Sequence, residues 1–75
     1  MQYTEFGKFI RRKRKSLKPK ISLNNFAINN GIETSALSRI ETQKQGISLD
    51  RLAQIANGFN VSVSELIAEY EQTYK

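Results

Sequence analysis

The chain has 75 residues and a mass of 8.6 kDa, which leaves room for one small domain. Hydrophobic residues make up 39% of it and charged residues 25%, a composition typical of globular proteins. Cysteine and histidine are both absent, which excludes disulfides, thiol nucleophiles, a histidine general base and the usual zinc sites. No apolar run approaches the length of a membrane span, and no secretory leader is recognisable. We therefore expect a soluble, cytoplasmic protein that holds no metal and is not an enzyme.

Positive charge gathers in the first half of the chain. The formal net charge is +5 at pH 7, and the isoelectric point is near 9.8. Residues 1–46 carry an excess of +7, whereas residues 47–75 carry −2. The segment from Lys8 to Lys20 holds eight Lys and Arg residues and no acid. This asymmetry predicts a polyanionic partner, with nucleic acid ahead of an anionic membrane, and a solvated helix face is the alternative.

Helical periodicity extends along the whole chain, beginning with two segments. The first helix is expected from about Thr4, which can cap it, to Leu17, because Pro19 disfavours helical backbone in the residue before it. The second is expected to begin at Ser22, another candidate cap, and to stop at the Asn29-Asn30-Gly31 turn.

Three further helices complete the pattern. The third is expected over about Thr34 to Thr42, and the fourth begins after Ser48 with apolar residues at helical spacing as far as Phe59. The fifth begins with Ser62 and Glu65, which are three residues apart, as in the reciprocal capping box. No stretch alternates with the two-residue period of a strand. The predicted fold class is all-α.

Residues Ile21 to Ile40 have the spacing of a helix-turn-helix. Ala27 is small enough for the next helix to cross closely, and Gly31 tolerates the positive φ of a tight turn. Ile32 and Leu37 would hold the third helix to the core and leave its polar side exposed. Four side chains on that polar side suit the major groove of DNA: Thr34, Ser35, Ser38 and Arg39.

At this point a family resemblance is visible in the stretches FGKFIRRKR, ISLNNFAINNGIETSALSRIE and SLDRLAQIANGFNVSVSELI. They resemble the lambda-repressor and Cro type of helix-turn-helix, the XRE family of bacterial regulators. The resemblance covers about residues 6–68, the core of a single domain over 1–75 with a C-terminal helix extension at 69–75. It implies a compact five-helix fold whose second and third helices form the helix-turn-helix. It also implies sequence-specific binding of double-stranded DNA, as a homodimer on a palindromic operator and without a cofactor.

Carried onto this sequence, the resemblance implies which residues meet the duplex. Arg39 is the strongest candidate for reading a base, since a guanidinium can hold O6 and N7 of guanine together. An ion pair with Glu33 or a plain phosphate contact is the alternative for Arg39, and a helix cap is the alternative for Thr34 and Ser35. Phosphate contacts are expected from six residues: Lys20, Ser22, Asn24, Asn25, Lys44 and Gln45.

Glu41 is an acid beside a helix expected to bind DNA. The family pairs a glutamate at this position with an arginine near the end of the first helix, and Arg14 lies at the matching place. We expect a structural ion pair, so Arg14 is not counted as a DNA contact. The sequence departs from the family pattern at Leu23, where a phosphate-binding glutamine is common, and at Gln43 and Ile47, which alter the loop after the third helix.

Apolar residues continue into the last helix at three- or four-residue spacing. They form a candidate dimer interface, with packing against the bundle as the alternative: Val63, Leu66, Ile67, Tyr70 and Tyr74. Two functions stay open, a transcriptional repressor and a protein-interaction module of the same fold, such as an antitoxin that binds a toxin and regulates its own operon. An enzyme and a membrane-surface binder fit less well, because no nucleophile–base pair is present and the apolar residues of the basic helix are needed in the core. Nothing in the sequence indicates a small-molecule ligand.

Overall fold

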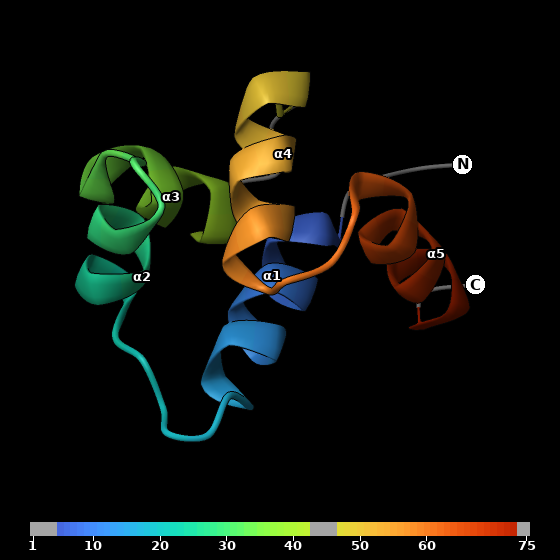
Figure 1. The fold of residues 1–75 in the computed structure, drawn as a ribbon, viewed down its shortest axis with the longest axis horizontal. Coiled ribbons are helices and arrows are strands. Elements are labelled where there is room, and N and C mark those ends of the chain that lie inside the picture. Colours follow the sequence, from blue (N-terminus) through green and yellow to red (C-terminus); the bar gives the residue numbers. More distant parts are fainter. Residues whose placement is uncertain (1–4, 43–46, 74–75) are drawn as a thin grey trace.

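The computed structural model describes residues 5–42 and 47–73, and these ranges form five α-helices (Figure 1). No strand occurs in the described ranges, so the all-α fold class predicted from periodicity is confirmed. The helices follow one another in the predicted order: α1 Phe6–Lys15, α2 Leu23–Asn29, α3 Thr34–Thr42, α4 Leu49–Gly58 and α5 Val63–Thr73.

Serine side chains begin three of the helices, as the sequence predicts. Ser22 and Ser48 each accept, through Oγ, the backbone N–H of the residue three positions later at 3.1 Å. Ser62 accepts the Glu65 N–H at 3.1 Å while the Glu65 carboxylate accepts the Ser62 N–H at 3.0 Å, which is the reciprocal capping box. The predicted cap of the first helix, Thr4, lies outside the described residues.

The first helix ends earlier than predicted. Its last residue is Lys15 rather than Leu17, and the Leu17 N–H bonds to the Arg14 carbonyl oxygen, three residues earlier, at 3.2 Å, which tightens the last turn. The connection to α2 therefore begins before Pro19, which the sequence takes as the stop signal.

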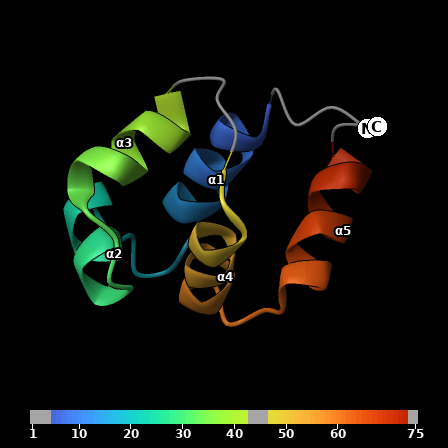
Figure 2. The same cartoon turned by 90° about the horizontal axis from the view of Figure 1, so that it is seen from above.

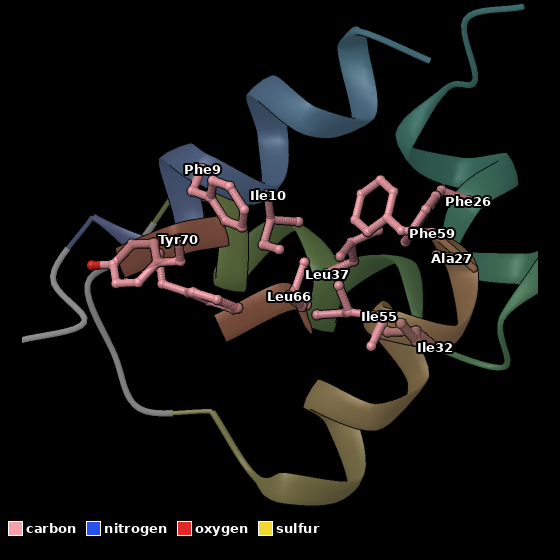
Figure 3. Close-up of a cluster of buried hydrophobic side chains, with 12 residues drawn as sticks. Phe9, Ile10, Phe26, Ala27, Ile32, Leu37, Ile55, Phe59, Leu66 and Tyr70 are labelled. Carbon is pink, nitrogen blue, oxygen red and sulfur yellow. The ribbon is translucent and has the colours of Figure 1, made fainter. Parts of the chain in front are cut away.

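The core lies where the five helices meet (Figure 3). At one end Tyr70 packs edge-on against Phe6 and Phe9, with ring centroids 5.3 and 5.5 Å apart. At the other end Phe26 packs against Phe59, with ring centroids 4.9 Å apart. Between the two aromatic groups lie aliphatic side chains from four helices, which are almost fully buried: Ile10, Leu37, Ile55 and Leu66.

Leu66 and Tyr70 belong to this core, with 0% and 2% of their surface exposed. For these two residues the structure agrees with the alternative, packing against the bundle, because the chain's own helices cover them. Val63 and Ile67 are half-buried and pack against the same core, so each keeps part of its surface accessible. Tyr74 lies outside the described residues.

The helices are arranged in an order that separates α3 from α5. Both views show α1 and α4 in the middle, with α2 and α3 together on one side and α5 on the other (Figures 1 and 2). The contact between α1 and α3 is close because Gly7 lies in it: a Cβ atom there would collide with the carbonyl oxygen of Ile40. None of the helices in the described ranges has the length and apolar character needed to cross a membrane.

Candidate nucleic-acid interface

The turn between α2 and α3 has the geometry that the sequence predicts for a helix-turn-helix. Ala27 is completely buried where the two helices meet, and its carbonyl oxygen accepts the Ile32 N–H at 2.9 Å. Gly31 has a φ of 70°, the left-handed conformation that glycine adopts without steric cost. Leu37, with 0% exposure, then fixes the underside of α3 to the core.

A second support of this turn comes from α4. Gln54 donates from Nε2 to the Gly31 carbonyl oxygen at 3.3 Å, and Arg51 donates to the Gln54 Oε1 at 3.1 Å. Sequence reasoning missed this contact, because Gln54 is an ordinary polar residue of an amphipathic helix until the fold places it beside the turn. The Gln54–Gly31 hydrogen bond links the helix-turn-helix to α4 in the middle of the molecule, and Arg51 holds the Gln54 side chain from the same helix.

The polar side of α3 is accessible along its length. Ser35 and Arg39 are exposed, whereas Thr34 and Ser38 are half-buried. Among the described residues Arg39 has no ion-pair partner, so the alternative pairing with Glu33 does not occur there. An exposed guanidinium held on a helix with a buried apolar underside remains available to a ligand.

Glu33, not Thr34, is the cap residue of α3. The Glu33 carbonyl oxygen accepts the first helical bond, from the Leu37 N–H at 3.0 Å, and the helix begins at Thr34. The alternative function of Thr34 as a cap is thereby removed, and its side chain lies in the first turn of α3.

Four of the six predicted phosphate-contacting residues lie around the start of α2, and all four are exposed: Lys20, Ser22, Asn24 and Asn25. Ser22 Oγ is engaged as the cap of α2, where it accepts the Asn25 N–H. A serine hydroxyl that accepts one hydrogen bond can still donate its own proton, so this bond leaves Ser22 able to contact an anion. Lys44 and Gln45 lie outside the described residues.

Arg14 and Glu41 form the buried ion pair that the sequence predicts. Arg14 Nε and one terminal nitrogen each lie 2.9 Å from a different Glu41 oxygen, a two-pronged contact between α1 and α3. Their side chains are only 8% and 1% exposed. The hydrogen bond to Glu41 raises the pKa of Arg14 above its ordinary value, despite the burial that opposes the charge.

Arg14 also makes a contact that sequence reasoning missed. Its other terminal nitrogen donates to the Ile21 carbonyl oxygen at 3.0 Å, one residue before the cap of α2. One guanidinium thus joins α1, the entrance of α2 and the last turn of α3. No sequence signal marks Ile21 as a partner, because the contact is made by its backbone.

Lys13 is another member of the basic segment that the fold uses internally. Its Nζ lies 2.8 and 3.1 Å from the two carboxylate oxygens of Glu69 on α5, and it lies over the Phe59 ring at 5.2 Å. Sequence reasoning counted Lys13 with the free bases, since its partner is 56 positions away in the chain.

The described residues contain no group of three or more acids placed to hold a metal ion.

Comparison with known families agrees with this geometry. A family model described as helix-turn-helix matches residues 10–66, a range that includes α2, α3, α4 and the Arg14–Glu41 pair. Comparisons with curated proteins and with solved structures give no match.

Proposed function

Since the matched range covers most of its length, the chain belongs to the XRE-type helix-turn-helix family of DNA-binding transcription regulators, and we propose that it represses transcription by occupying a specific operator. The family is regulatory rather than enzymatic. The observation that carries the proposal is the orientation of α3: Leu37 on its underside is fully buried, while Ser35 and Arg39 on the opposite side are exposed. A helix held in this way can enter the major groove without rearrangement of the core.

Base reading is assigned to α3. Arg39 binds guanine, and the short hydroxyl side chains approach the edges of neighbouring bases. A hydroxyl can donate or accept a hydrogen bond, so it can contact more than one kind of base. The proposed base-reading set is Thr34, Ser35, Ser38 and Arg39. Residues on both sides of the helix-turn-helix fix the register through phosphates: Lys20, Ser22, Asn24, Asn25, Lys44 and Gln45.

A homodimer on a palindromic operator completes the proposal. Two copies of α3 would then meet half-sites about 34 Å apart, one turn of the duplex. With Leu66 and Tyr70 in the core, the candidate interface is reduced to Val63, Ile67 and Tyr74. A regulator of this kind acts in the cytoplasm, where bacterial DNA lies.

A protein-interaction module, such as an antitoxin that holds a toxin, is the second candidate. Ile28 and Leu49 support it, because these large apolar side chains are 69% and 73% exposed and are available to a protein partner. In that case the operator would serve autoregulation, and sequence-specific binding would be weak without the partner.

Selection of bound sequences from random duplex DNA tests the proposal. We expect an enriched palindrome whose half-sites are separated by about one helical turn. In competition, the selected duplex should bind at least about 1,000-fold more tightly than a scrambled one. Equal competition by the two duplexes would contradict a specific regulator and favour the interaction module.

A further inference from the structure

Four exposed bases lie on one side of α1, and none of them takes part in the core or in the proposed contacts with the operator. They occupy positions separated by three, four and seven residues and so share one helix face; we name them the α1 stripe: Lys8, Arg11, Arg12 and Lys15. The stripe borders a shallow basin of about 560 Å³, whose far edge is formed by Glu41 and Thr42 at the end of α3.

The stripe is unfavourable for the helix that carries it. Like charges three and four residues apart on a helix repel each other, and the four members form several such pairs. Lys8 is 3.2 Å from Glu5, but the three other members make no ion pair with a described residue. The helix dipole favours Arg12 and Lys15 in the last turn and does nothing for Arg11.

The other two bases of α1 differ from the stripe because each has an ion-pair partner within the fold. Lys13 is turned to Glu69 and Arg14 to Glu41, each at 2.8 or 2.9 Å and each partly or fully buried. Arg14 also neutralises Glu41, the one acid that lines the basin. The basin therefore presents uncompensated positive charge, which a polyanion would complement.

The position of the stripe relative to α3 identifies the polyanion. Gly7 brings α1 against the Ile40 and Glu41 backbone, so the basin continues directly from the exposed end of α3. A duplex with its major groove filled by α3 has its phosphate ridges on either side of that helix. The stripe lies beside α3 at Glu41 and Thr42, so one of these two ridges would lie over it.

We propose that the α1 stripe is a second phosphate-binding surface that holds the DNA backbone beside the half-site. The proposal rests on the function proposed above and extends its contacts beyond α2 and the loop after α3. From Lys8 to Lys15 the helix rises about 10 Å. Phosphates of one strand follow each other at about 3.4 Å along the duplex axis and lie farther apart along the strand itself, so a stripe of this length can meet more than one of them. It adds affinity for any sequence and does not select bases.

The test is the salt dependence of binding for Arg11→Gln/Arg12→Gln, measured by fluorescence anisotropy on the selected operator and on a scrambled duplex. We expect the slope of log K against log salt to become shallower by about 1 to 2, equally on both duplexes, since each phosphate contributes about 0.9. The variant should be at least as stable as the wild type, because it removes repulsion.

Two control variants separate a local contact from net charge. Arg11→Lys/Arg12→Lys keeps both charges and should keep the wild-type slope. Asn60→Asp/Gln72→Glu changes the net charge by the same amount at exposed positions near and on α5, and Asn60 has a φ of 59° that aspartate tolerates. This control should also leave the slope nearly unchanged, so an equal effect of both charge changes would overturn the proposal.

Other outcomes distinguish this inference from the proposed function. A specific operator combined with an unchanged slope in Arg11→Gln/Arg12→Gln would refute the stripe and leave the regulator intact. A shallower slope without any preferred sequence would support the stripe and refute the regulator. Loss of binding to phosphatidylserine vesicles with an unchanged slope on DNA would assign the stripe to an anionic membrane instead.

Discussion

Arg14 and Arg39 are the same residue type in opposite surroundings. All three guanidinium nitrogens of Arg14 donate hydrogen bonds within the molecule, to Glu41 and to the Ile21 carbonyl oxygen, and its side chain is 8% exposed. Arg39 lies exposed on α3. A guanidinium that is already satisfied contributes to the fold, whereas an accessible one can exchange water for a base edge. The two positions therefore predict opposite phenotypes.

At Arg39 we expect a change of specificity. Arg39→Ala should remove about 1–3 kcal/mol of discrimination at one base position of each half-site. Lys20→Ala is the matched comparison, because its exposed ammonium is proposed to contact phosphate only. It should weaken all duplexes alike and lower the salt slope by about 1. Competition binding against operators with single base changes measures both. If Arg39→Ala weakened every sequence equally, its base-reading role would be wrong.

At Arg14 we expect a loss of stability. Arg14→Met leaves the Glu41 carboxylate buried without a partner, and Glu41→Leu leaves the Arg14 charge in the same condition. Breaking a buried pair from one side costs about 3–5 kcal/mol of unfolding free energy. The double variant Arg14→Met/Glu41→Leu should lose less than the sum of the single variants, since it buries no lone charge. Urea unfolding measures all three free energies, and additive losses would contradict a coupled pair.

At the scale of elements, contacts between near neighbours in the chain can be predicted from the sequence, whereas contacts between distant residues cannot. The serine caps, the capping box and the Gly31 turn depend on neighbours within a few residues, so the sequence contains the whole cause. The Arg14–Glu41 pair came from a family resemblance, since nothing local joins residues 27 positions apart. The links from Lys13 to Glu69 and from Gln54 to the turn had neither kind of signal and were missed.

Gly7 fixes how closely α1 approaches α3. A Cβ atom at this position would meet backbone carbonyl oxygens, which cannot rotate away as a flexible side chain can. We expect Gly7→Ala to destabilise the protein by about 1–3 kcal/mol through overpacking, although alanine has the higher helix propensity. Lys8→Ala at the next, exposed position should change unfolding by less than about 0.5 kcal/mol. A stabilised Gly7→Ala variant would show that the two helices can separate without cost.

The capping box of α5 gives a pH dependence of known sign. The Ser62 N–H, together with its hydroxyl, lowers the pKa of the exposed Glu65 below its ordinary value of 4.5. The stabilisation is therefore complete above the pKa of the unfolded chain and is lost as pH falls through that of the folded protein. Glu65→Gln should remove this part of the acid sensitivity. The measurement is the urea midpoint of each protein near neutral pH and near pH 3. If the difference between the two midpoints were the same in Glu65→Gln as in the wild type, the contribution of the cap would be contradicted.

On the scale of the whole molecule, the fold separates the helix-turn-helix from the last helix. α3 lies on one side of α1 and α4, and α5 lies on the other (Figures 1 and 2). The sequence predicts five helices and their order, but it does not decide whether the apolar residues of the last helix face inward or toward a second copy. The spacing of apolar residues is the same whether a helix packs against its own bundle or against a second copy. The aromatic contacts of Tyr70 with Phe6 and Phe9 decide for this residue, and only the tertiary arrangement supplies them.

Tyr70 therefore provides a test of which surface closes the bundle. Tyr70→Ala should cost about 3–5 kcal/mol, as for other large buried aromatic residues, because it opens a cavity beside Phe6 and Phe9. Tyr70→Phe removes only the hydroxyl that accepts the Glu5 N–H at 3.3 Å, and it should lose about 1 kcal/mol. A core residue produces a loss that is independent of protein concentration, whereas a dimer contact produces one that grows on dilution. Thermal unfolding over a hundredfold range of concentration separates the two, and a concentration-dependent loss in Tyr70→Ala would return Tyr70 to the dimer interface.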